Sequence, residues 1–514
     1  MRKYIFIFFF SVLNINSFSG QNNSGRPVRF FPVDNGKNIN PDTHLILSFS
    51  GTPVLGTKGK IRVFDADTNR LIDSLDLSIP AGPTKAVDHG NKIPPYTQFP
   101  YKYVSDNFTN ANTKPGIPSG GAITNPDTFQ LNIIGRFTDA FHFYPVIIND
   151  KAATIYLHNN ILQYNKSYYI QIDPEVLTFS DGSFIGITEK TWTFTTKKNA
   201  PSLNSGKLVV SGDGSGDFST VQGAIDFVPD YNTKHVTIYI KKGNYEEMVY
   251  FRNKTNVTFL GEDRNKTVVF YANNEVFNPH PANISTNELP GTFPSRRAAF
   301  ACDNSKNIQF INFTIKTTLK GQAEGLLIMG EKNILSNMNI SGSGDALQAN
   351  GSVYINNSTI EGDGDTFLSR GPAFFNQCEI KSKSTFMWMR NTAANHGVVL
   401  LNCKLINTGE TDTQIVRAPV NNGNSYPDCE VVLINCGLSG ISPLGWGPLG
   451  NVSNVHCWEY NSLNLTDGKP VDVGRRHPAS RQLIQDKDAK TIANYSNPAY
   501  ILNDWKPVIY KPGR

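Results

Sequence analysis

The sequence predicts an all-β protein in which a β-sandwich precedes a parallel β-helix. Charged residues make up only 18% of the 514 residues, and Gly, Asn, Thr and Ser are abundant. This composition favours strands joined by turns over helices. Short apolar runs separated by turn clusters fill the first part of the chain, and one short phrase recurs at intervals through the second part. A length of 514 residues also favours at least two domains.

The first residues have the pattern of a signal peptide, which we place at 1–19. Arg2 and Lys3 precede an apolar run over 4–13, and small residues follow at Ser17 and Ser19. A positive start, a short apolar stretch and small residues before a cleavage point are typical of a segment removed on export. Crossing a bilayer needs roughly 20 apolar residues, more than any segment offers. We expect an exported protein, periplasmic or extracellular, without a membrane span.

Residues 26–196 predict the β-sandwich. Alternating or apolar runs are bounded there by turn residues, as in a sandwich of short strands. We expect strands at His44–Ser50, Lys60–Phe64, Ala153–Leu157, Ser167–Ile172 and Thr191–Thr196. The Pro- and Gly-rich stretch 80–127 interrupts this rhythm and predicts a long loop, and the polar segment 197–207 predicts a linker. The region resembles bacterial Ig-like modules through Pro32–Gly36 and Trp192–Thr196.

Residues 208–514 predict the β-helix. The recurring phrase stands at Ile311–Ile315, Ser336–Ile340, Asn356–Ile360, Asn376–Ile380, Leu401–Leu405 and Ile434–Leu438. One strand of constant type per 20–33 residues is typical of a solenoid. Residues two apart share a strand face, so the middle and last residues of each phrase should point inward and stack from coil to coil.

The cysteines fit this interpretation. All six lie in the second half, and no CxxC pair suggests a zinc site. Cys378, Cys403 and Cys436 are middle residues of three phrases, so we expect them in an internal ladder of small, soft side chains. Export would permit disulfides, which remain open for these residues.

Two aspartates carry the strongest chemical signal. Asp345 in Gly342–Ala346 and Asp365 in Gly362–Thr366 stand one 20-residue step apart, in the same phase of the repeat. Stacked coils would place them roughly 5 Å apart. Two carboxylates so close do not both ionise cheaply, so one pKa rises while the other stays low, which separates an acid from a nucleophile. Capping of a Gly-rich turn is the alternative for either residue alone.

From Lys207 to about Pro507 the chain resembles the pectin methylesterases, or pectinesterases, of carbohydrate esterase family 8. The resemblance rests on Gly216–Ile225, Tyr245–Glu247, Thr258–Glu262, Gly321–Leu326, Gly344–Leu347, Asp365–Leu368, Ile415–Pro419, Ile441–Trp446 and Trp458–Tyr460. It implies a right-handed parallel β-helix that acts on methyl-esterified galacturonate. It further implies Asp365 as nucleophile, Asp345 as general acid and base, Gln322 as oxyanion donor and Arg417 as partner of Asp365.

The chain departs from the family pattern around this site. Gly344 stands where the family has a Gln before the first aspartate, and no Trp follows Arg417. Thr366 and Leu368 replace aromatic residues after the nucleophile. Loss of one oxyanion donor costs about 10²–10³ in rate. These differences motivate a second hypothesis, an esterase for another ester such as O-acetyl on a plant or algal polysaccharide.

Other residues are weaker candidates for substrate contact. Trp388 fits a sugar-stacking platform or core packing equally well, and Trp446 falls on a family landmark. Arg370 and His396 would contact uronate carboxylates, although exposed Arg and His are commonly plain surface. A net charge of +5 without a dense basic block argues against nucleic acid as a partner. We expect a monomer that binds pectin or a related uronate polysaccharide and needs no metal or cofactor.

A third hypothesis keeps the scaffold without the esterase. A polysaccharide lyase would depend on calcium bound by acidic clusters. A glycan-binding β-helix would bind without turning over its ligand. The sequence leaves these alternatives open.

Overall fold

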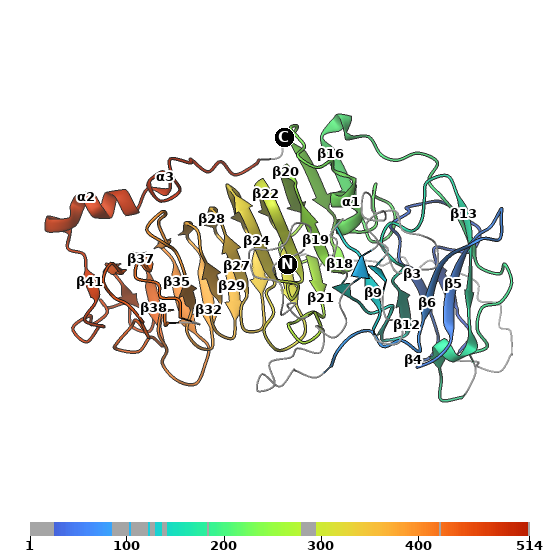
Figure 1. Cartoon of the computed structure of the whole chain (residues 1–514), viewed down its shortest axis with the longest axis horizontal. Coiled ribbons are helices and arrows are strands. Elements are labelled where there is room, and N and C mark those ends of the chain that lie inside the picture. Colours follow the sequence, from blue (N-terminus) through green and yellow to red (C-terminus); the bar gives the residue numbers. More distant parts are fainter. Residues whose placement is uncertain are drawn as a thin grey trace, which may run out of the picture.

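A computed structural model describes residues 25–84, 102–103, 122–123, 129–135, 141–181, 184–278, 295–420 and 423–511. The expected signal peptide, and most of the loop expected over 80–127, lie outside the described residues. Figure 1 shows a long ladder of strands with a smaller β-structure against its N-terminal end. The parallel β-helix predicted from the repeat is confirmed, since both long sheets of this ladder are built from parallel pairs.

The smaller part consists of two main sheets. One has the order β1-β3-β12-β11 and the other β2-β15-β13-β5-β6. The strands are β1 (Arg29–Phe31), β2 (Gly36–Ile39), β3 (Leu45–Ser48), β5 (Lys60–Asp65), β6 (Leu71–Asp76), β11 (Val146–Asn149), β12 (Ala152–Ile155), β13 (Ser167–Ile172) and β15 (Thr193–Thr196). Short pairs β4 (Val54–Leu55) with β14 (Leu177–Thr178), β9 (Leu131–Asn132) with β10 (Phe141–His142), and β7 (Lys102–Tyr103) with β8 (Ala122–Ile123) complete it. Side chains of both main sheets share one core, so the region is a sandwich.

The strands of the β-helix form three rows. The first and second rows together make the 17-stranded sheet, and the third row is the 9-stranded sheet. The first row contains β19 (Val249–Arg252), β22 (Phe300–Ile311), β24 (Leu326–Glu331), β27 (Leu347–Asn350), β30 (Phe367–Ser369), β33 (Met387–Met389) and β36 (Val416–Arg417). The second contains β16 (Lys207–Val210), β17 (Val236–Ile240), β20 (Thr255–Gly261), β22, β25 (Asn333–Ser336), β28 (Val353–Asn356), β31 (Ala373–Asn376), β34 (Val398–Leu401), β37 (Glu430–Ile434), β39 (His456–Tyr460) and β41 (Ser480–Gln482).

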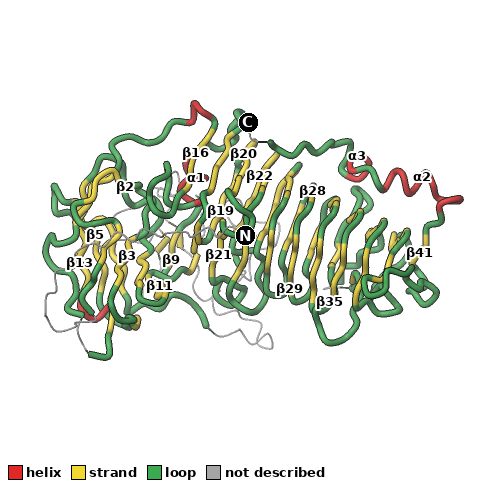
Figure 2. Tube along the Cα trace, turned by 180° about the vertical axis from the view of Figure 1, so that it is seen from behind, coloured by secondary structure: helices red, strands yellow, loops and turns green. Residues whose placement is uncertain are grey.

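The third row contains β18 (Gly243–Glu246), β21 (Thr267–Tyr271), β23 (Thr314–Thr317), β26 (Asn339–Ser341), β29 (Thr359–Gly362), β32 (Glu379–Ser382), β35 (Lys404–Asn407), β38 (Gly437–Ser439) and β40 (Leu463–Asn464). Figure 2 shows the rows from behind as regular yellow segments. Ile340 pairs with Ile360, and Ile360 with Ile380, all fully or almost fully buried. The predicted inward stacking of the repeat is therefore confirmed.

The recurring phrase marks the bend between the second and third rows. Its second residue takes a positive φ on successive coils, at Asn312, Asn337, Asn357, Gln377, Asn402 and Asn435. Asparagine tolerates this left-handed conformation better than most residues. The amides also bond along the stack, as from Asn337 Nδ2 to Asn312 Oδ1 at 2.6 Å and from Asn357 Nδ2 to Asn337 Oδ1 at 3.2 Å. The repeat thus follows from the turn as well as from the core.

All six cysteines are free and buried. Cys378, Cys403 and Cys436 stack inside the β-helix as predicted, with the backbone N–H of Cys378 3.4 Å from the Cys403 sulfur. Burial raises the pKa of the Cys436 thiol to about 12, which keeps it an unreactive packing group.

The sandwich is docked directly on the β-helix. Phe141 packs against Tyr250 of β19 with ring centroids 4.5 Å apart, and both side chains are fully buried. Asp42 accepts hydrogen bonds from the backbone N–H groups of Ser219 and Thr220 at 2.9 and 2.8 Å, just before α1 (Val221–Phe227). The sandwich core therefore extends onto residues of the early coils such as Tyr250, while the interior of the β-helix forms a separate cluster.

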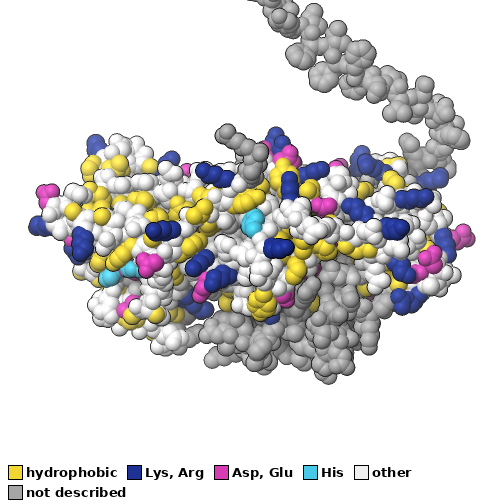
Figure 3. Space-filling model, turned by 90° about the horizontal axis from the view of Figure 1, so that it is seen from above, with side chains coloured by type: hydrophobic (Ala, Val, Ile, Leu, Met, Phe, Trp, Pro, Cys, Tyr) yellow, Lys and Arg dark blue, Asp and Glu magenta, His cyan; other side chains and the backbone are white. Residues whose placement is uncertain are grey.

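The C-terminal segment returns along the β-helix. Helices α2 (Gln485–Tyr495) and α3 (Pro498–Ile501) pack over the late coils, and the following segment runs back toward β22, where Tyr510 N–H bonds to Gln309 at 2.8 Å. Figure 3 views this side and shows Lys and Arg spread singly rather than gathered in one block. Within the described ranges, no helix has the length and apolar character to span a membrane.

Candidate active site

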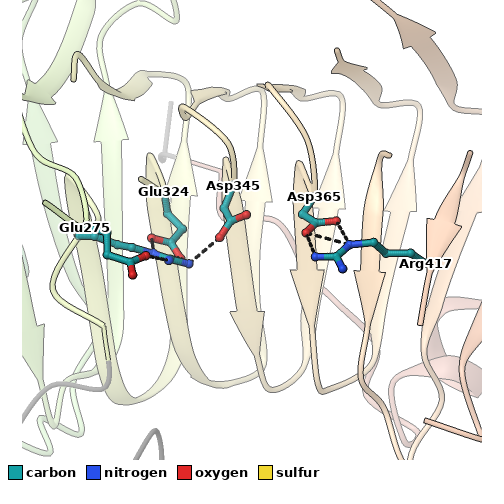
Figure 4. A network of polar contacts seen from close by, with 6 residues as sticks. Glu275, Glu324, Asp345, Asp365 and Arg417 are labelled. Carbon is teal, nitrogen blue, oxygen red and sulfur yellow. Dashed lines mark hydrogen bonds and ion pairs between the residues drawn. The ribbon is translucent and has the colours of Figure 1, made fainter. Parts of the chain in front are cut away.

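Three acidic side chains form a row at the start of the first-row strands. Glu324, Asp345 and Asp365 each stand two residues before the first residue of β24, β27 and β30, and those first residues pair in register. Figure 4 shows the three carboxylates on neighbouring coils. Adjacent coils are separated by the roughly 4.8 Å of a parallel ladder. The structure thus brings Asp345 and Asp365 together on neighbouring coils, where the sequence places them.

Asp365 is held by Arg417 of β36. Arg417 Nε donates to Oδ1 at 2.8 Å and to Oδ2 at 3.1 Å, and Nη2 also donates to Oδ2. A forked guanidinium contact of this kind favours the ionised carboxylate and fixes its orientation. The bond to Asp365 also raises the pKa of Arg417. Asp365 itself has φ +46°, an uncommon backbone conformation that the surrounding coils hold in place.

Asp345 lies deeper. Its side chain is 3% exposed, against 15% for Asp365. Burial is the largest cause that raises the pKa of Asp345, to about 7; the charge of Arg297 opposes the rise, while Glu324 and Asp365 add to it. At neutral pH a substantial fraction of Asp345 therefore carries a proton.

Arg297 is the main contact that sequence reasoning missed. Its Nη2 donates to Asp345, its Nε and Nη2 donate to Glu324 at 2.9 Å, and its Nη1 donates to Glu275 at 2.6 Å. The phase of Glu324 was readable, since it precedes its strand by two residues as the two aspartates do. Arg297 precedes a strand of ordinary composition, and no pattern marks it.

Gln322 lies beside the turn that carries Asp345. A Cβ added to Gly344 would come within 3.7 Å of Gln322 Cγ, which places the two residues in contact distance. Gln322 is exposed, and its side chain forms no hydrogen bond with a described residue. Gly344 has φ +77°, so a glutamine there would be strained in this backbone.

Trp388 stands next to Arg417 in the first row. The two residues pair in register, and the guanidinium groups of Arg417 and Arg390 lie 4.4 and 4.6 Å from the ring centroid. Cation–π contacts at this distance hold an arginine over an aromatic ring. In this structure Trp388 therefore supports Arg417. Thr366, one residue after Asp365, is buried, and its hydroxyl donates a hydrogen bond to the Ser382 hydroxyl at 2.7 Å.

The remaining candidates lie in other surroundings. Trp446 is fully buried in the β-helix core, so the expectation that it contacts substrate is wrong for this fold. His396 Nδ1 lies 2.8 Å from Glu430, in a cluster with His456 and Tyr495 of α2, and no contact joins it to the described residues of the aspartate pair. Arg370 follows β30 and is half-buried.

The arrangement has side chains suited to ester hydrolysis. It offers a carboxylate oriented by an arginine, a second carboxyl whose pKa of about 7 lets it hold a proton near neutral pH, and a glutamine next to the turn of that second carboxyl, which are parts of nucleophilic and general acid catalysis. In the part of the chain that the structure describes, no group of three His, Cys, Asp or Glu side chains is placed to hold a metal ion.

Comparison with known proteins gives consistent matches. The family model described as pectinesterase matches residues 207–501. Probable pectinesterase 30 of Arabidopsis thaliana is 25% identical over 292 residues, covering 53% of this chain and 56% of the relative. Pectinesterase QRT1 of the same plant is 28% identical over 297 residues, covering 54% and 74%. The pectin methylesterase structure from carrot aligns with a TM-score of 0.46 and 19% identity, covering 58% of this chain and 93% of that one.

The residues matched by the family model lie in the β-helix part. The chain spans about half the length of the first curated relatives that it matches. The sandwich strands from β1 to β15 precede the matched residues.

Proposed function

The chain belongs to the pectinesterase family, and from this premise we propose that it hydrolyses methyl esters of galacturonate units in pectin to give pectate and methanol. The observation that carries the proposal is the different environment of two neighbouring aspartates. Asp365 is paired one-to-one with Arg417, while Asp345 is buried with a pKa of about 7. This difference supplies a nucleophile and a proton donor at the same pH.

In the first step, an Asp365 oxygen attacks the ester carbonyl carbon. The carbonyl electrons move onto its oxygen, and Gln322 stabilises this oxygen by donating from its side-chain amide. Collapse of this intermediate breaks the bond to the methoxy oxygen, and Asp345 gives its proton to that oxygen so that methanol leaves. The product of the step is an anhydride between the uronate and Asp365.

In the second step, water hydrolyses the anhydride. Asp345, now a carboxylate, takes a proton from the water, whose oxygen attacks the acyl carbon. The uronate leaves as a free carboxylic acid, Asp365 is regenerated as a carboxylate, and Asp345 is again protonated. The protons balance over the cycle, and no metal or cofactor takes part in the scheme.

Two further arginines support a polyuronate as substrate. Neither Arg370 nor Arg390 forms an ion pair with a described carboxylate. Arg390 lies within electrostatic range of Arg370 and Asp345, and burial lowers its pKa to about 10. Half-buried guanidinium groups without a carboxylate partner are suited to bind carboxylates of a ligand. We propose Arg370, predicted from sequence, and Arg390 as contacts for uronates beside the ester.

An O-acetyl esterase on the same scaffold is the second candidate. It is favoured by the absence of the family glutamine at Gly344 and of an aromatic residue at Thr366, since both changes alter the wall around the ester. Native pectin carrying both esters separates the candidates. If the chain is a pectin methylesterase, we expect it to release more methanol than acetate from this substrate. Acetate release with little methanol would replace this proposal with the second candidate, and unsaturated products that need calcium would indicate a lyase.

Export, a monomeric state and a periplasmic or extracellular location remain predictions from the sequence. They fit a substrate that lies in plant cell walls. Fractionation of the producing cells and the sedimentation of the purified protein would test them. The division into residues 26–196, a linker over 197–207 and a catalytic part over 208–514 is likewise a proposal.

A further inference from the structure

Arg297 is shared unequally among three carboxylates. Two of its nitrogens, Nε and Nη2, donate to Glu324 at 2.9 Å, while Nη1 donates to Glu275 at 2.6 Å and Nη2 also reaches Asp345. Figure 4 shows Glu275 and Glu324 on one side of Asp345, with Asp365 and Arg417 on the other. Arg297 thus makes its bidentate contact with Glu324 and a single contact with Asp345.

The charges around the two aspartates therefore differ. Asp365 shares one guanidinium with no other carboxylate among the described residues. Asp345, Glu324 and Glu275 share one guanidinium among three acids. Other charged groups that act on Asp345 are Asp365 and, without direct contact, Arg390 and Arg417. A cluster with more carboxylates than cations relieves its repulsion most cheaply by binding a proton.

We propose that Glu324 is a positioning residue for the esterase reaction, which occupies Arg297 and thereby leaves Asp345 as the proton donor of the pair. Glu324 is fully buried, and its oxygens accept from Arg297 on two nitrogens, so the guanidinium is held away from full pairing with Asp345. The inference rests on the proposed function, because it assigns the pH at which that reaction runs.

Glu275 ties the same group to the oxyanion side of the site. Its side chain binds Arg297, and its backbone N–H donates to the carbonyl of Gln322 at 2.8 Å. Two residues further, Phe277 stacks on Tyr144 of the sandwich with centroids 4.5 Å apart. The segment around Glu275 therefore connects the sandwich, Arg297 and the loop of Gln322.

The test is the pH dependence of methanol release by Glu324→Gln. The amide keeps the size of the side chain and one acceptor for Arg297 but removes a negative charge about one coil from Asp345. Arg297 is then freer to stabilise ionised Asp345, so the alkaline limb of kcat/KM should move to lower pH by about one unit or more. Glu361→Gln, on exposed Glu361 of β29 in the third row, is the matched control and should leave the limb unmoved.

A readout independent of turnover separates this inference from the proposed function. NMR titration of the Asp345 carboxyl, identified by comparison with Asp345→Asn, should show the same downward shift in Glu324→Gln even if pectin is not the substrate. An unmoved Asp345 titration in a variant that unfolds at the wild-type temperature would overturn the inference. An upward shift would do the same. Absence of methanol release by wild-type protein would overturn the proposed function alone.

Discussion

Asp345 and Asp365 occupy equivalent places on neighbouring coils, yet their surroundings give them different chemistry. The register of β27 and β30 gives the two residues the same place in the coil, although only Asp365 has a positive φ. What separates them is burial, 3% against 15% exposure, and the number of acids that share each guanidinium. At the residue scale, the difference between the two aspartates therefore comes from their burial and from the arginines and acids around them.

The pH dependence of the reaction follows from this difference. In the proposed mechanism Asp345 must carry a proton to release methanol, and its folded-state pKa is about 7, above the ordinary value of 3.8. Raising the pH through 7 removes the proton, so kcat/KM should fall about tenfold per pH unit on the alkaline side. A rate profile on methyl-esterified pectin, corrected for spontaneous ester hydrolysis, checks this. A flat profile up to pH 9 would contradict the role of Asp345 as acid.

The sequence predicted part of this residue-scale account. Phase within the repeat was enough to pair Asp345 with Asp365, and the resemblance supplied Arg417 and Gln322. Arg297 was beyond its reach because its side chain crosses between coils from a position that carries no motif. Trp446 was assigned wrongly because a family landmark does not distinguish a buried tryptophan from one that lines a cleft.

At the scale of a single turn, the stacked asparagines stabilise a left-handed backbone conformation. Asn357 has φ +47° and bonds to Asn337 on the coil before it. Asn357→Ala removes the amide hydrogen bonds and leaves an alanine in the left-handed conformation. Alanine cannot offset the strain with a local hydrogen bond, so the free energy of unfolding should fall by about 1–2 kcal/mol. Asn357→Gly loses the same amide but adopts this φ without strain, so it should be the more stable of the two. Urea unfolding of both variants measures the difference; equal stabilities would contradict the conformational explanation.

The cysteine ladder makes a second prediction at the scale of the element. All six thiols are buried and unpaired, so a thiol reagent should modify none of them in the native protein. In guanidinium chloride without reductant it should modify six. Fewer than six reactive thiols after unfolding would show that export leads to disulfides, and rapid labelling before unfolding would contradict the packing of the coils.

The strands themselves were largely predictable from the sequence, and the contacts between distant segments were not. Strand Ser167–Ile172 was predicted at its observed bounds, because a short run of apolar and aromatic residues is a local property of the sequence. The expected linker over 197–207 is less free than its composition suggested: Lys197 donates to the Gly216 carbonyl at 2.6 Å, and β16 already begins at Lys207. A contact across the chain leaves no trace in local composition.

At the scale of the whole molecule, the core of the sandwich extends onto side chains of the early β-helix coils, while the β-helix keeps its own interior core. The sequence showed two regions of different pattern and gave no sign that they pack against each other. Phe141 and Tyr250, which make this contact, are ordinary apolar residues in their own strands. The consequence is that the sandwich supports the catalytic part physically. It reaches the active-site loops through Phe277 and Glu275.

This docking predicts a large cost for Phe141→Ala. The ring is fully buried against Tyr250, so its loss should destabilise the protein by about 3–5 kcal/mol. Phe30→Ala, in β1, is the control: its ring is only partly buried and packs on Trp192 inside the sandwich. Denaturant unfolding followed by tryptophan fluorescence compares the two. If Phe141→Ala lowers the free energy of unfolding no more than the control does, the packing of the sandwich on the β-helix contributes little to stability.

The most direct test of the central claim is methanol release from methyl-esterified pectin by wild type and three aspartate variants. We expect release by the wild type, no detectable release by Asp365→Ala, and a loss of at least about 10² for Asp345→Asn. Asp363→Asn should retain most of the wild-type rate, since Asp363 shares the turn of Asp365 but pairs with Lys383 instead. Wild-type rates in folded Asp365→Ala and Asp345→Asn proteins would contradict the account.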